Sequence, residues 1–273
     1  MKKPHQLLGL PKPKSEASGG PLSLKDYEVY SGIEIPEKPL FVRLDGWNFH
    51  TLTKKLNFKK PFDPFLAQAL RNAALGVFKA WPAQLCYIFS DEINFLFLST
   101  PGWRRVEKID SILASFFSTA FLSELRKRHK YIKTVAFDCR CIPLIGKNPK
   151  KLILDYLTWR QAECFRNCIN AWAQYLLQTK EGLSARTAAK KLEGLKAKQL
   201  LNLIKKHGID LKSKARIDRD GLLLYKRAIQ KFGYNPIQKK KVRVLRNIVD
   251  FGVAPKFNTL SGKRFLSKIL NFN

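Results

Sequence analysis

The stretch QLCYIFSDEINFLFL, residues 84–98, decides the fold. Its two apolar runs, 84–89 and 93–98, are rich in aromatic and branched side chains, and only the polar residues Ser-Asp-Glu at 90–92 separate them. Apolar runs of this length with polar residues between them are typical of buried β-strands joined by a turn. The sequence therefore predicts a β-hairpin in the first half of the chain.

The segments on both sides extend this hairpin into a larger unit. An apolar run at 39–44 predicts a strand before it, and alternating residues at 131–137 predict a strand after it. Between these strands, apolar residues recur with the helical period at 63–79 and at 104–129. The resulting βαββαβ order predicts an α+β fold with a ferredoxin-like sheet.

The rest of the chain differs in composition. Residues 1–25 are rich in Lys, Pro, Ser and Gly and predict a flexible basic arm. We expect one domain over 26–180, which ends in a long helix at 149–178, and a basic C-terminal region over 181–273. In that region we expect helices at 185–192 and 197–207, and strands at 221–229 and 241–249 that form a hairpin turning at 233–236.

A large positive charge limits the classes of partner. The chain holds 51 Lys and Arg against 21 Asp and Glu, a formal net charge of +30, while 45% hydrophobic residues argue against disorder. Residues 180–273 alone hold 24 basic and six acidic residues. Such a charge opposes compaction, and its usual reason is a polyanionic partner, with nucleic acid ahead of an acidic membrane. A protein that acts only on a small neutral substrate is disfavoured.

Two further features concern the compartment. No apolar stretch reaches 18 residues and the N-terminus has no signal-peptide pattern, so we expect a soluble, cytoplasmic protein without a membrane partner. The five cysteines are typical of reduced, buried thiols. Cys139 with Cys141 and Cys164 with Cys168 leave a four-thiolate zinc site as an alternative, although neither spacing is that of a standard zinc knuckle.

Two acidic residues stand at strand ends that we expect to be neighbours. Asp45 follows the first strand, and Asp91 lies in the turn of the adjacent hairpin. Carboxylates held close together repel each other unless a cation lies between them, and oxygen ligands suit Mg²⁺. Ordinary polar turns are the alternative, and spacing alone favours them, because Asp and Gly are common in turns for backbone reasons.

A basic cluster opens the expected helix at 104–129. Arg104, Arg105 and Lys108 lie in its first turn and a half, where cations oppose the helix dipole, so helix stability does not explain them. They favour a phosphate site at the helix start. A solvated basic face is an equally good interpretation in a chain of this charge. Lys60, before the helix at 63–79, is a similar and weaker case.

Six pieces in the same order resemble the tRNA-histidine guanylyltransferase family, whose members extend RNA in the 3′–5′ direction. The matching pieces are VRLDGWNFHTL (42–52), NFKKPFD (57–63), FSDEINFLF (89–97), RRVEKIDSILAS (104–115), FDCR (137–140) and YLTWRQAECFRN (156–167). The resemblance covers about residues 26–180 and implies a polymerase-like palm with two Mg²⁺ ions, GTP or another nucleotide and ATP as substrates, and the tRNA acceptor end as partner. It also implies a homo-oligomer, a dimer or a tetramer.

The resemblance gives roles to particular residues. Asp45 and Asp91 become the catalytic, metal-ligating carboxylates, and the Gly46 carbonyl joins them. The implied nucleotide- and triphosphate-binding residues are Arg43, Asn48, Phe49, His50, Lys60, Ser90, Glu92, Arg104, Arg105 and Lys108. Further candidates within the matching pieces are Asp138, Arg140, Trp159, Arg160 and Asn167.

The sequence departs from the family pattern at two places. Trp47 stands where eukaryotic members have Arg, and the residues at 165–171 read FRNCINA in place of a run that begins with His. These departures favour the guanylyltransferase-like branch, which adds templated nucleotides to 5′-truncated tRNA. A guanylyltransferase dedicated to histidine tRNA and a non-catalytic RNA-binding protein are the alternatives.

Overall fold

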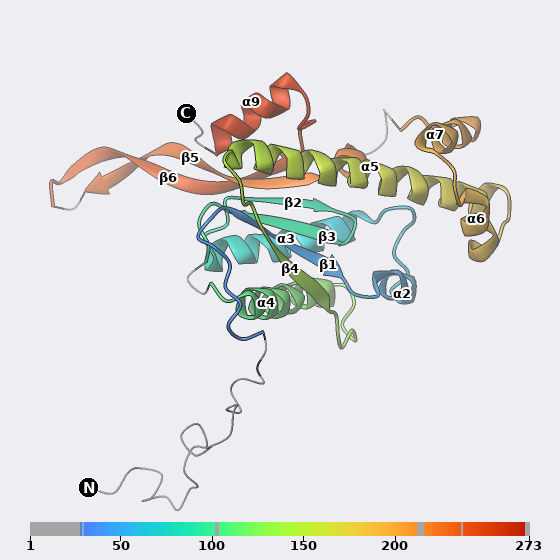
Figure 1. Cartoon of the computed structure of the whole chain (residues 1–273), viewed down its shortest axis with the longest axis horizontal. Coiled ribbons are helices and arrows are strands. Elements are labelled where there is room, and N and C mark those ends of the chain that lie inside the picture. The colour runs from blue at the N-terminus through green and yellow to red at the C-terminus, as the bar shows by residue number, and fades with distance from the viewer. Residues whose placement is uncertain (1–27, 29, 102–103, 212–215, 236, 271–273) are drawn as a thin grey trace, which may run out of the picture.

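The computed structural model describes residues 28, 30–101, 104–211, 216–235 and 237–270. The expected arm over 1–25 lies outside these residues. Figure 1 shows how the strands and helices are arranged. The elements are β1 (Leu40–Gly46), α2 (Phe49–Lys55), α3 (Pro64–Ala80), β2 (Leu85–Phe89), β3 (Glu92–Phe97), α4 (Val106–Arg126), β4 (Phe137–Pro143), α5 (Pro149–Lys180), α6 (Ala185–Leu192), α7 (Ala197–Lys206), α8 (Arg216–Asp220), β5 (Leu222–Asn235), β6 (Lys240–Val253) and α9 (Leu260–Ile269).

One antiparallel sheet organises the molecule, with the strand order β4-β1-β3-β2-β5-β6. The strands expected around residues 84–98 are confirmed as the β2–β3 hairpin, and its two-residue turn consists of Ser90 and Asp91. β1 lies between β3 and β4 and pairs Asp45 with Glu92 on one side and with Asp138 on the other. The mixed α+β class is therefore confirmed.

The fourth strand lies further along the chain than the sequence pattern predicts. We expected it at 131–137, but β4 begins at Phe137, which pairs with Gly46, and continues to Pro143. Tyr131, which helped to suggest a strand, is 95% exposed. The prediction was wrong because aromatic and β-branched residues in a surface loop mimic strand alternation, whereas pairing with β1 decides where a strand forms.

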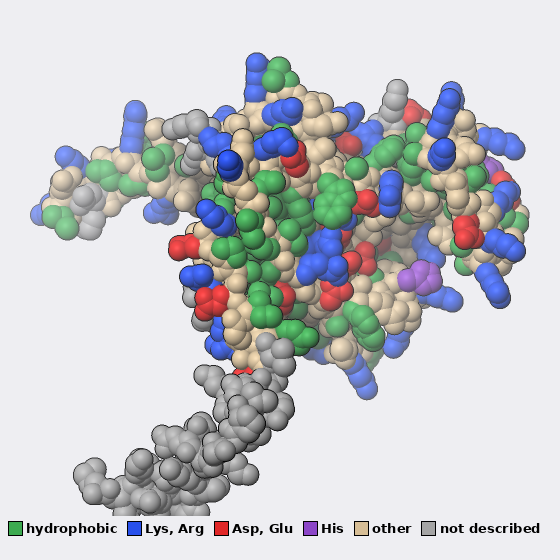
Figure 2. All heavy atoms as spheres, viewed as in Figure 1, with side chains coloured by type: hydrophobic (Ala, Val, Ile, Leu, Met, Phe, Trp, Pro, Cys, Tyr) green, Lys and Arg blue, Asp and Glu red, His purple; other side chains and the backbone are tan. Residues whose placement is uncertain are grey.

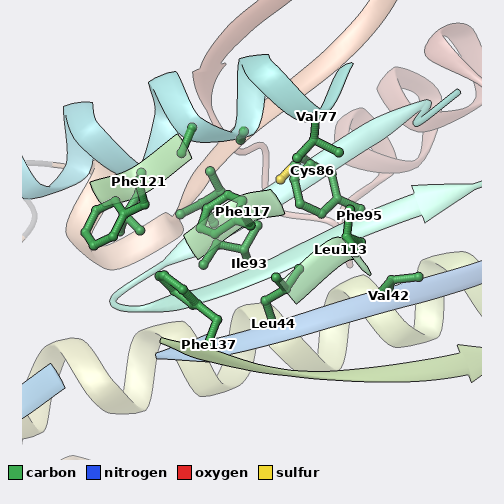
Figure 3. Close-up of a cluster of buried hydrophobic side chains, with 14 of the residues drawn as sticks. Val42, Leu44, Val77, Cys86, Ile93, Phe95, Leu113, Phe117, Phe121 and Phe137 are labelled. Carbon is green, nitrogen blue, oxygen red and sulfur yellow. The ribbon is translucent and has the colours of Figure 1, made fainter. Parts of the chain in front are cut away.

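The two faces of the sheet carry different helices (Figure 1). On one face, α3 and α4 pack against alternate strand residues such as Val42, Ile93 and Phe95. Phe117 of α4 meets the ring of Phe137 edge to face, with 4.9 Å between ring centroids (Figure 3). Because successive strand residues point to opposite faces, the neighbours Phe41 and Leu96 face α5 and α9 instead. The sheet is therefore covered on both sides.

The C-terminal hairpin continues the same sheet. β5 pairs with β2 from Leu222 to Tyr225, and its remaining residues pair only with β6 as far as Asn235 and Lys240. The hairpin thus extends beyond the sheet and turns later than the predicted 233–236 (Figure 1). At its root, Gly221 has a φ of +85° and lies so close to the Tyr87 ring that no β-carbon would fit. The Tyr87 hydroxyl donates a hydrogen bond to the Asp220 carbonyl at 3.0 Å.

The helices after α5 form a third apolar cluster. α6 and α7 pack against the second half of α5, where Ile169, Leu200 and Ile204 are buried together. Ser184 caps α6 by accepting from the Thr187 amide at 3.1 Å. Among the described helices, none is both long enough and apolar enough to cross a bilayer.

Candidate active site

The two acidic residues singled out in the sequence come together at one end of the sheet. Asp45 is the second-last residue of β1. Asp91 lies next to this strand end, because the Gly46 amide donates a hydrogen bond to the Asp91 carbonyl at 3.1 Å. Burial raises the pKa of Asp91, and the nearby Asp45 carboxylate raises it further. A hydrogen bond of 2.9 Å from the Ser90 hydroxyl acts in the opposite direction. The structure therefore places two mutually repelling carboxylates side by side.

This donor set fits a divalent cation. In the described part of the chain, neither Asp45 nor Asp91 has a Lys or Arg nitrogen within 4.0 Å, so the charge of the pair is not balanced by a salt bridge. The same residues contain no group of three His, Cys, Asp or Glu side chains that could hold a metal. Two carboxylates leave positions for further oxygen ligands, such as water and phosphate oxygens, as Mg²⁺ sites usually do.

Local packing fixes the chain around this pair. The ring of Phe49 lies directly over Gly46, so a side chain at position 46 would overlap it. Asn48 then takes a left-handed conformation with a φ of 55° and leads into α2. Glycine is thus required at position 46 by the close approach of the Phe49 ring to the strand end.

A cleft of about 460 Å³ opens beside Asp91. Its walls are α2, the loop before α3, the β2–β3 turn, the second half of α5, and α8. The predicted site residues that line it are Phe49, His50, Lys60, Ser90, Asp91 and Asn167. Asp63 shapes the wall that carries Lys60, because its carboxylate accepts from the Lys59 amide at 2.9 Å and from the Phe65 amide at 2.8 Å.

The sequence analysis missed the opposite wall of the cleft. Tyr175 and Gln174 of α5 and Asp218 of α8 line it. Burial raises the pKa of Asp218 to about 6. No local pattern indicated these residues, because α8 is a single short turn and the second half of α5 resembles any amphipathic helix.

Glu92 and Arg160 form a buried ion pair beside the carboxylates. Arg160 donates from Nε to Glu92 Oε1 at 2.9 Å and from Nη2 to Oε2 at 2.8 Å. Trp159, the residue before Arg160, is half exposed, and the Arg160 guanidinium lies 4.3 Å from the centre of its ring. The structure thus brings Trp159 and Arg160 of α5 to the site end of the sheet, and it directs Glu92 toward Arg160.

A second set of predicted residues lies on the same face of β1 and β4. Arg43 pairs with Arg140 across the two strands, and Asp45 pairs with Asp138. Arg140 donates to Asp138 at 2.8 Å, and this hydrogen bond is the largest cause that raises the pKa of Arg140. The Arg43 Nε is buried and has no hydrogen-bond partner among the described atoms. Two arginines directly opposite each other repel, so sheet stability does not explain them.

The basic cluster at the start of α4 lies elsewhere. Arg104 donates from Nε to the Ile35 carbonyl at 3.2 Å, next to the beginning of β1, whereas Asp45 is at its end. Arg105 contacts Glu107. Within one copy of the chain, the structure therefore does not bring Arg104, Arg105 or Lys108 to the two carboxylates.

The five cysteines are free thiols. Cys141 lies 3.2 Å from the Asp110 carboxylate beneath β4, whereas Cys164 and Cys168 face α8 from α5. Burial raises the pKa of Cys164 to about 12 and that of Cys168 to about 12. Cys139 and Cys141 pack against the apolar cluster of α3 and α4, whereas Cys164 lies in the cluster on the other face of the sheet, so the structure does not bring the four thiols together.

Comparison with known proteins identifies the family. The model for "tRNAHis guanylyltransferase" matches residues 22–145, and the model for the "Thg1 C terminal domain" matches residues 151–248. The tRNA(His) guanylyltransferase of Debaryomyces hansenii is 31% identical over 201 residues, which are 70% of this chain and 74% of that protein. The chain belongs to the Thg1 family.

Solved structures of relatives have the same fold. A bacterial Thg1-like protein in complex with ATP is 29% identical and superposes with a TM-score of 0.62 over 74% of this chain and 86% of the relative. A bacterial Thg1-like protein in complex with GTP is 24% identical, with a TM-score of 0.58 over 89% and 93% of the two chains. As a Thg1-family enzyme, the protein is a tRNA nucleotidyltransferase.

Proposed function

We propose that the protein adds templated nucleotides to the 5′ end of 5′-truncated tRNA in the 3′–5′ direction. The observation that carries this proposal is that the Asp45 and Asp91 carboxylates lie near each other, beside a cleft that Lys60 and His50 line. A carboxylate pair next to cationic and polar groups suits a substrate that carries a triphosphate. The solved relatives with ATP and with GTP support nucleotides of both kinds as substrates.

The sheet acts in this proposal as a polymerase-like palm. Its support is the β4-β1-β3-β2 strand order, in which two neighbouring central strands deliver both carboxylates to one end. We assign palm function to residues 26–180 and tRNA binding to residues 181–273.

Asp45, Asp91 and the Gly46 carbonyl would hold two Mg²⁺ ions. When bound, these ions lower the pKa of the attacking hydroxyl and neutralise charge on the leaving phosphates. The donor chemistry described above supports this assignment.

The remaining groups of the site position the reactants. Lys60 in the cleft wall and Arg43 with Arg140 on the sheet would bind phosphate oxygens, and Asn48, Phe49 and His50 would confine the nucleotide. The 3′-hydroxyl of the incoming nucleotide attacks the 5′-phosphoryl group of the RNA. Pyrophosphate leaves when the RNA carries a 5′-triphosphate, and AMP leaves when ATP has adenylylated a 5′-monophosphate. Alignment of the reactants supplies most of the rate.

The second half of α5 supports the choice of tRNA substrate. Phe165 stands where the family run begins with His, and it packs against the apolar cluster with α7, so no imidazole is present at that position. A guanylyltransferase dedicated to histidine tRNA is the alternative, and the similarity to the tRNA(His) guanylyltransferase of Debaryomyces hansenii favours it. We expect Watson–Crick pairing across the acceptor stem to select the nucleotide.

We further propose that the enzyme is a cytoplasmic homo-oligomer. The five free thiols support a reducing compartment. The distance of the α4 cluster from the carboxylates within one chain supports an assembly in which Arg104, Arg105 and Lys108 of one copy serve the site of another.

The test is incubation of a tRNA that lacks its first nucleotide with Mg²⁺, ATP and labelled GTP, with Asp45→Ala as the control. We expect addition to several 5′-truncated tRNAs by the wild type and none by the variant. Addition of a single guanosine to histidine tRNA alone would instead establish the dedicated enzyme. Tight tRNA binding without any addition would establish a non-catalytic RNA-binding protein.

A further inference from the structure

The inference concerns the buried pair of Glu92 and Arg160. Each residue is only 7% exposed, and both oxygens of the Glu92 carboxylate accept from the guanidinium. Asn94 donates to Glu92 Oε1 at 2.9 Å and accepts from the Tyr156 hydroxyl at 2.6 Å. Because its acceptor positions are engaged from within the protein, Glu92 is held in place and has little capacity left for a ligand.

The pair touches both residues that close the turn around Asp91. Phe89 and Glu92 pair with each other across the turn, and only Ser90 and Asp91 lie between them. The Arg160 guanidinium forms the ion pair with Glu92 and also lies 5.7 Å from the centre of the Phe89 ring. Ser90 holds a left-handed conformation with a φ of 51°, which a non-glycine residue adopts only when its surroundings enforce it. Arg160 is therefore well placed to enforce the shape of the turn.

Arg160 also controls the charge at the strand end. Glu92 is adjacent to Asp91 in the chain and opposite Asp45 in the sheet. Without the guanidinium, three carboxylates would lie together in a partly buried place, and the turn would be driven apart or protonated. With it, Glu92 has an ion-pair partner, as Asp138 has in Arg140, and among the described residues Asp45 and Asp91 are left without one at this strand end.

α5 itself is anchored at this level. The next residue, Gln161, donates to the Asp220 and Pro255 carbonyls at 3.1 and 2.9 Å and accepts from the Phe257 amide at 3.0 Å. These hydrogen bonds hold the helix turn that carries Arg160 against the residues around Asp220, Pro255 and Phe257.

We infer that Arg160 acts through Glu92 as a positioning residue that holds Asp91 beside Asp45 in the geometry a divalent cation requires. The inference rests on the proposed function. Partners of this kind orient the groups that bind the cation without touching it.

The experiment compares Arg160→Met, Arg160→Lys and the double variant Glu92→Gln/Arg160→Met with the wild type. Lys151→Gln is the matched control, because it removes a cation from the same helix at an exposed pair with Asp155. Mn²⁺ binding to the protein alone is followed through the electron paramagnetic resonance signal of free Mn²⁺. Nucleotide KM at saturating metal and the unfolding temperature are measured in parallel.

We expect Arg160→Met to weaken Mn²⁺ binding roughly 10- to 100-fold, the range typical of groups that orient metal ligands. Nucleotide KM at saturating metal stays within about twofold of the wild type, since the substrate contacts are intact. The Mn²⁺ affinity of Arg160→Lys is intermediate, because lysine keeps the positive charge but cannot donate two parallel hydrogen bonds to the Glu92 carboxylate. The double variant binds Mn²⁺ more tightly than Arg160→Met does, because the uncompensated Glu92 charge is gone. Lys151→Gln matches the wild type.

Two results would overturn the inference. Unchanged Mn²⁺ affinity with a raised KM for nucleotide or RNA would make Arg160 a substrate-binding residue. Unchanged Mn²⁺ affinity in the folded fraction with a lower unfolding temperature would leave it a purely structural role. Failure of the proposed function looks different, because the wild type would then bind Mn²⁺ and respond to these substitutions without extending RNA.

Discussion

Asp218 lines the cleft, and its surroundings destabilise the charged form of its carboxyl group. Burial alone raises its pKa, to about 6, and α8 supplies no cation at its carboxylate. The pKa in the folded protein therefore exceeds the value of about 3.9 expected when unfolded. A raised carboxyl pKa means that the folded state binds more protons between about pH 4 and 6, so this group's contribution to stability falls as the pH rises through that window.

We therefore expect Asp218→Asn to stabilise the protein near pH 7.5 by about 1 kcal/mol, a value reduced for the partial exposure of the carboxylate. Near pH 4 the gain should vanish, because the wild-type side chain is then neutral. Urea unfolding gives the free energy of unfolding of the wild type and of the variant at both pH values. The change in their difference between the two pH values cancels the pH dependence of all other groups. An equal effect of the substitution at both pH values would contradict the assigned pKa.

At the residue scale, the sequence allowed part of the site to be predicted. Local patterns singled out Asp45 and Asp91, because a strand end and a hairpin turn are visible in the sequence. Spacing alone favoured ordinary polar turns, however, and the catalytic role came from the family resemblance. The role of Arg160 was not visible, since its partner lies 68 positions away and the contact depends on how α5 crosses the sheet. Helical spacing shows only that one face of α5 is buried.

The β5–β6 hairpin is the element with the clearest binding surface. Ten residues of β5 lie beyond the last one paired with β2, a reach of about 33 Å for an extended chain. Phe232 pairs with Arg243 and Tyr234 pairs with Lys241, so all four side chains share one face. The aromatic pair is 75% and 64% exposed. Residues 226–249 hold eight basic and no acidic side chains. Figure 2 shows Lys and Arg side chains on the projecting hairpin, which suits RNA phosphates and opposes contact with another equally basic hairpin.

We expect the double variant Lys241→Gln/Arg243→Gln to raise the KM for tRNA while leaving the KM for nucleotide unchanged. Each lost phosphate contact should lower the slope of log affinity against log salt by about 0.9. Filter binding over a range of salt concentrations measures this slope. Lys79→Gln, at the exposed end of α3, is the control. Equal salt slopes for the double variant and the wild type would remove the hairpin from the RNA interface.

At the element scale, the sequence predicted most of the helices but not how distant strands pair. α3, α4 and α5 were found through their apolar period, with ends that shifted by a few residues, and the shorter α6 and α7 were found at 185–192 and 197–207. α2, α8 and α9 were missed. The sequence did not predict that β5 pairs with β2 and so extends the first sheet. Pairing between strands that lie so far apart in the chain leaves no local pattern.

The molecule as a whole separates two predicted parts of its site. The carboxylates lie at one end of β1, and the basic start of α4 lies near the other end. The proposed oligomer resolves this separation if the α4 cluster of one copy reaches the carboxylates of its neighbour.

We accordingly expect Asp91→Ala and Arg105→Ala to be inactive alone and to complement each other when co-expressed with different tags. A mixed dimer has one intact site of two, so dimers purified through both tags should restore about half of wild-type addition, and the unpurified mixture with random pairing about a quarter. Purification through both tags in sequence and light scattering define the assembly that is assayed. A fully active monomer, or mixed assemblies without addition, would refute the shared site.

The close approach of Gly221 to Tyr87 makes the attachment of the C-terminal hairpin unusually intolerant of mutation. A library of all amino acids at position 221, sorted for folded protein, should return almost only glycine, because every other residue would meet both the aromatic ring and an unfavourable backbone angle. The same library at Gly252, where nothing lies within 4 Å of an added β-carbon, should return many residues. One backbone position thus sets whether evolution can remodel the hairpin, to which we assign RNA binding, without disturbing the strands that carry the proposed catalytic carboxylates.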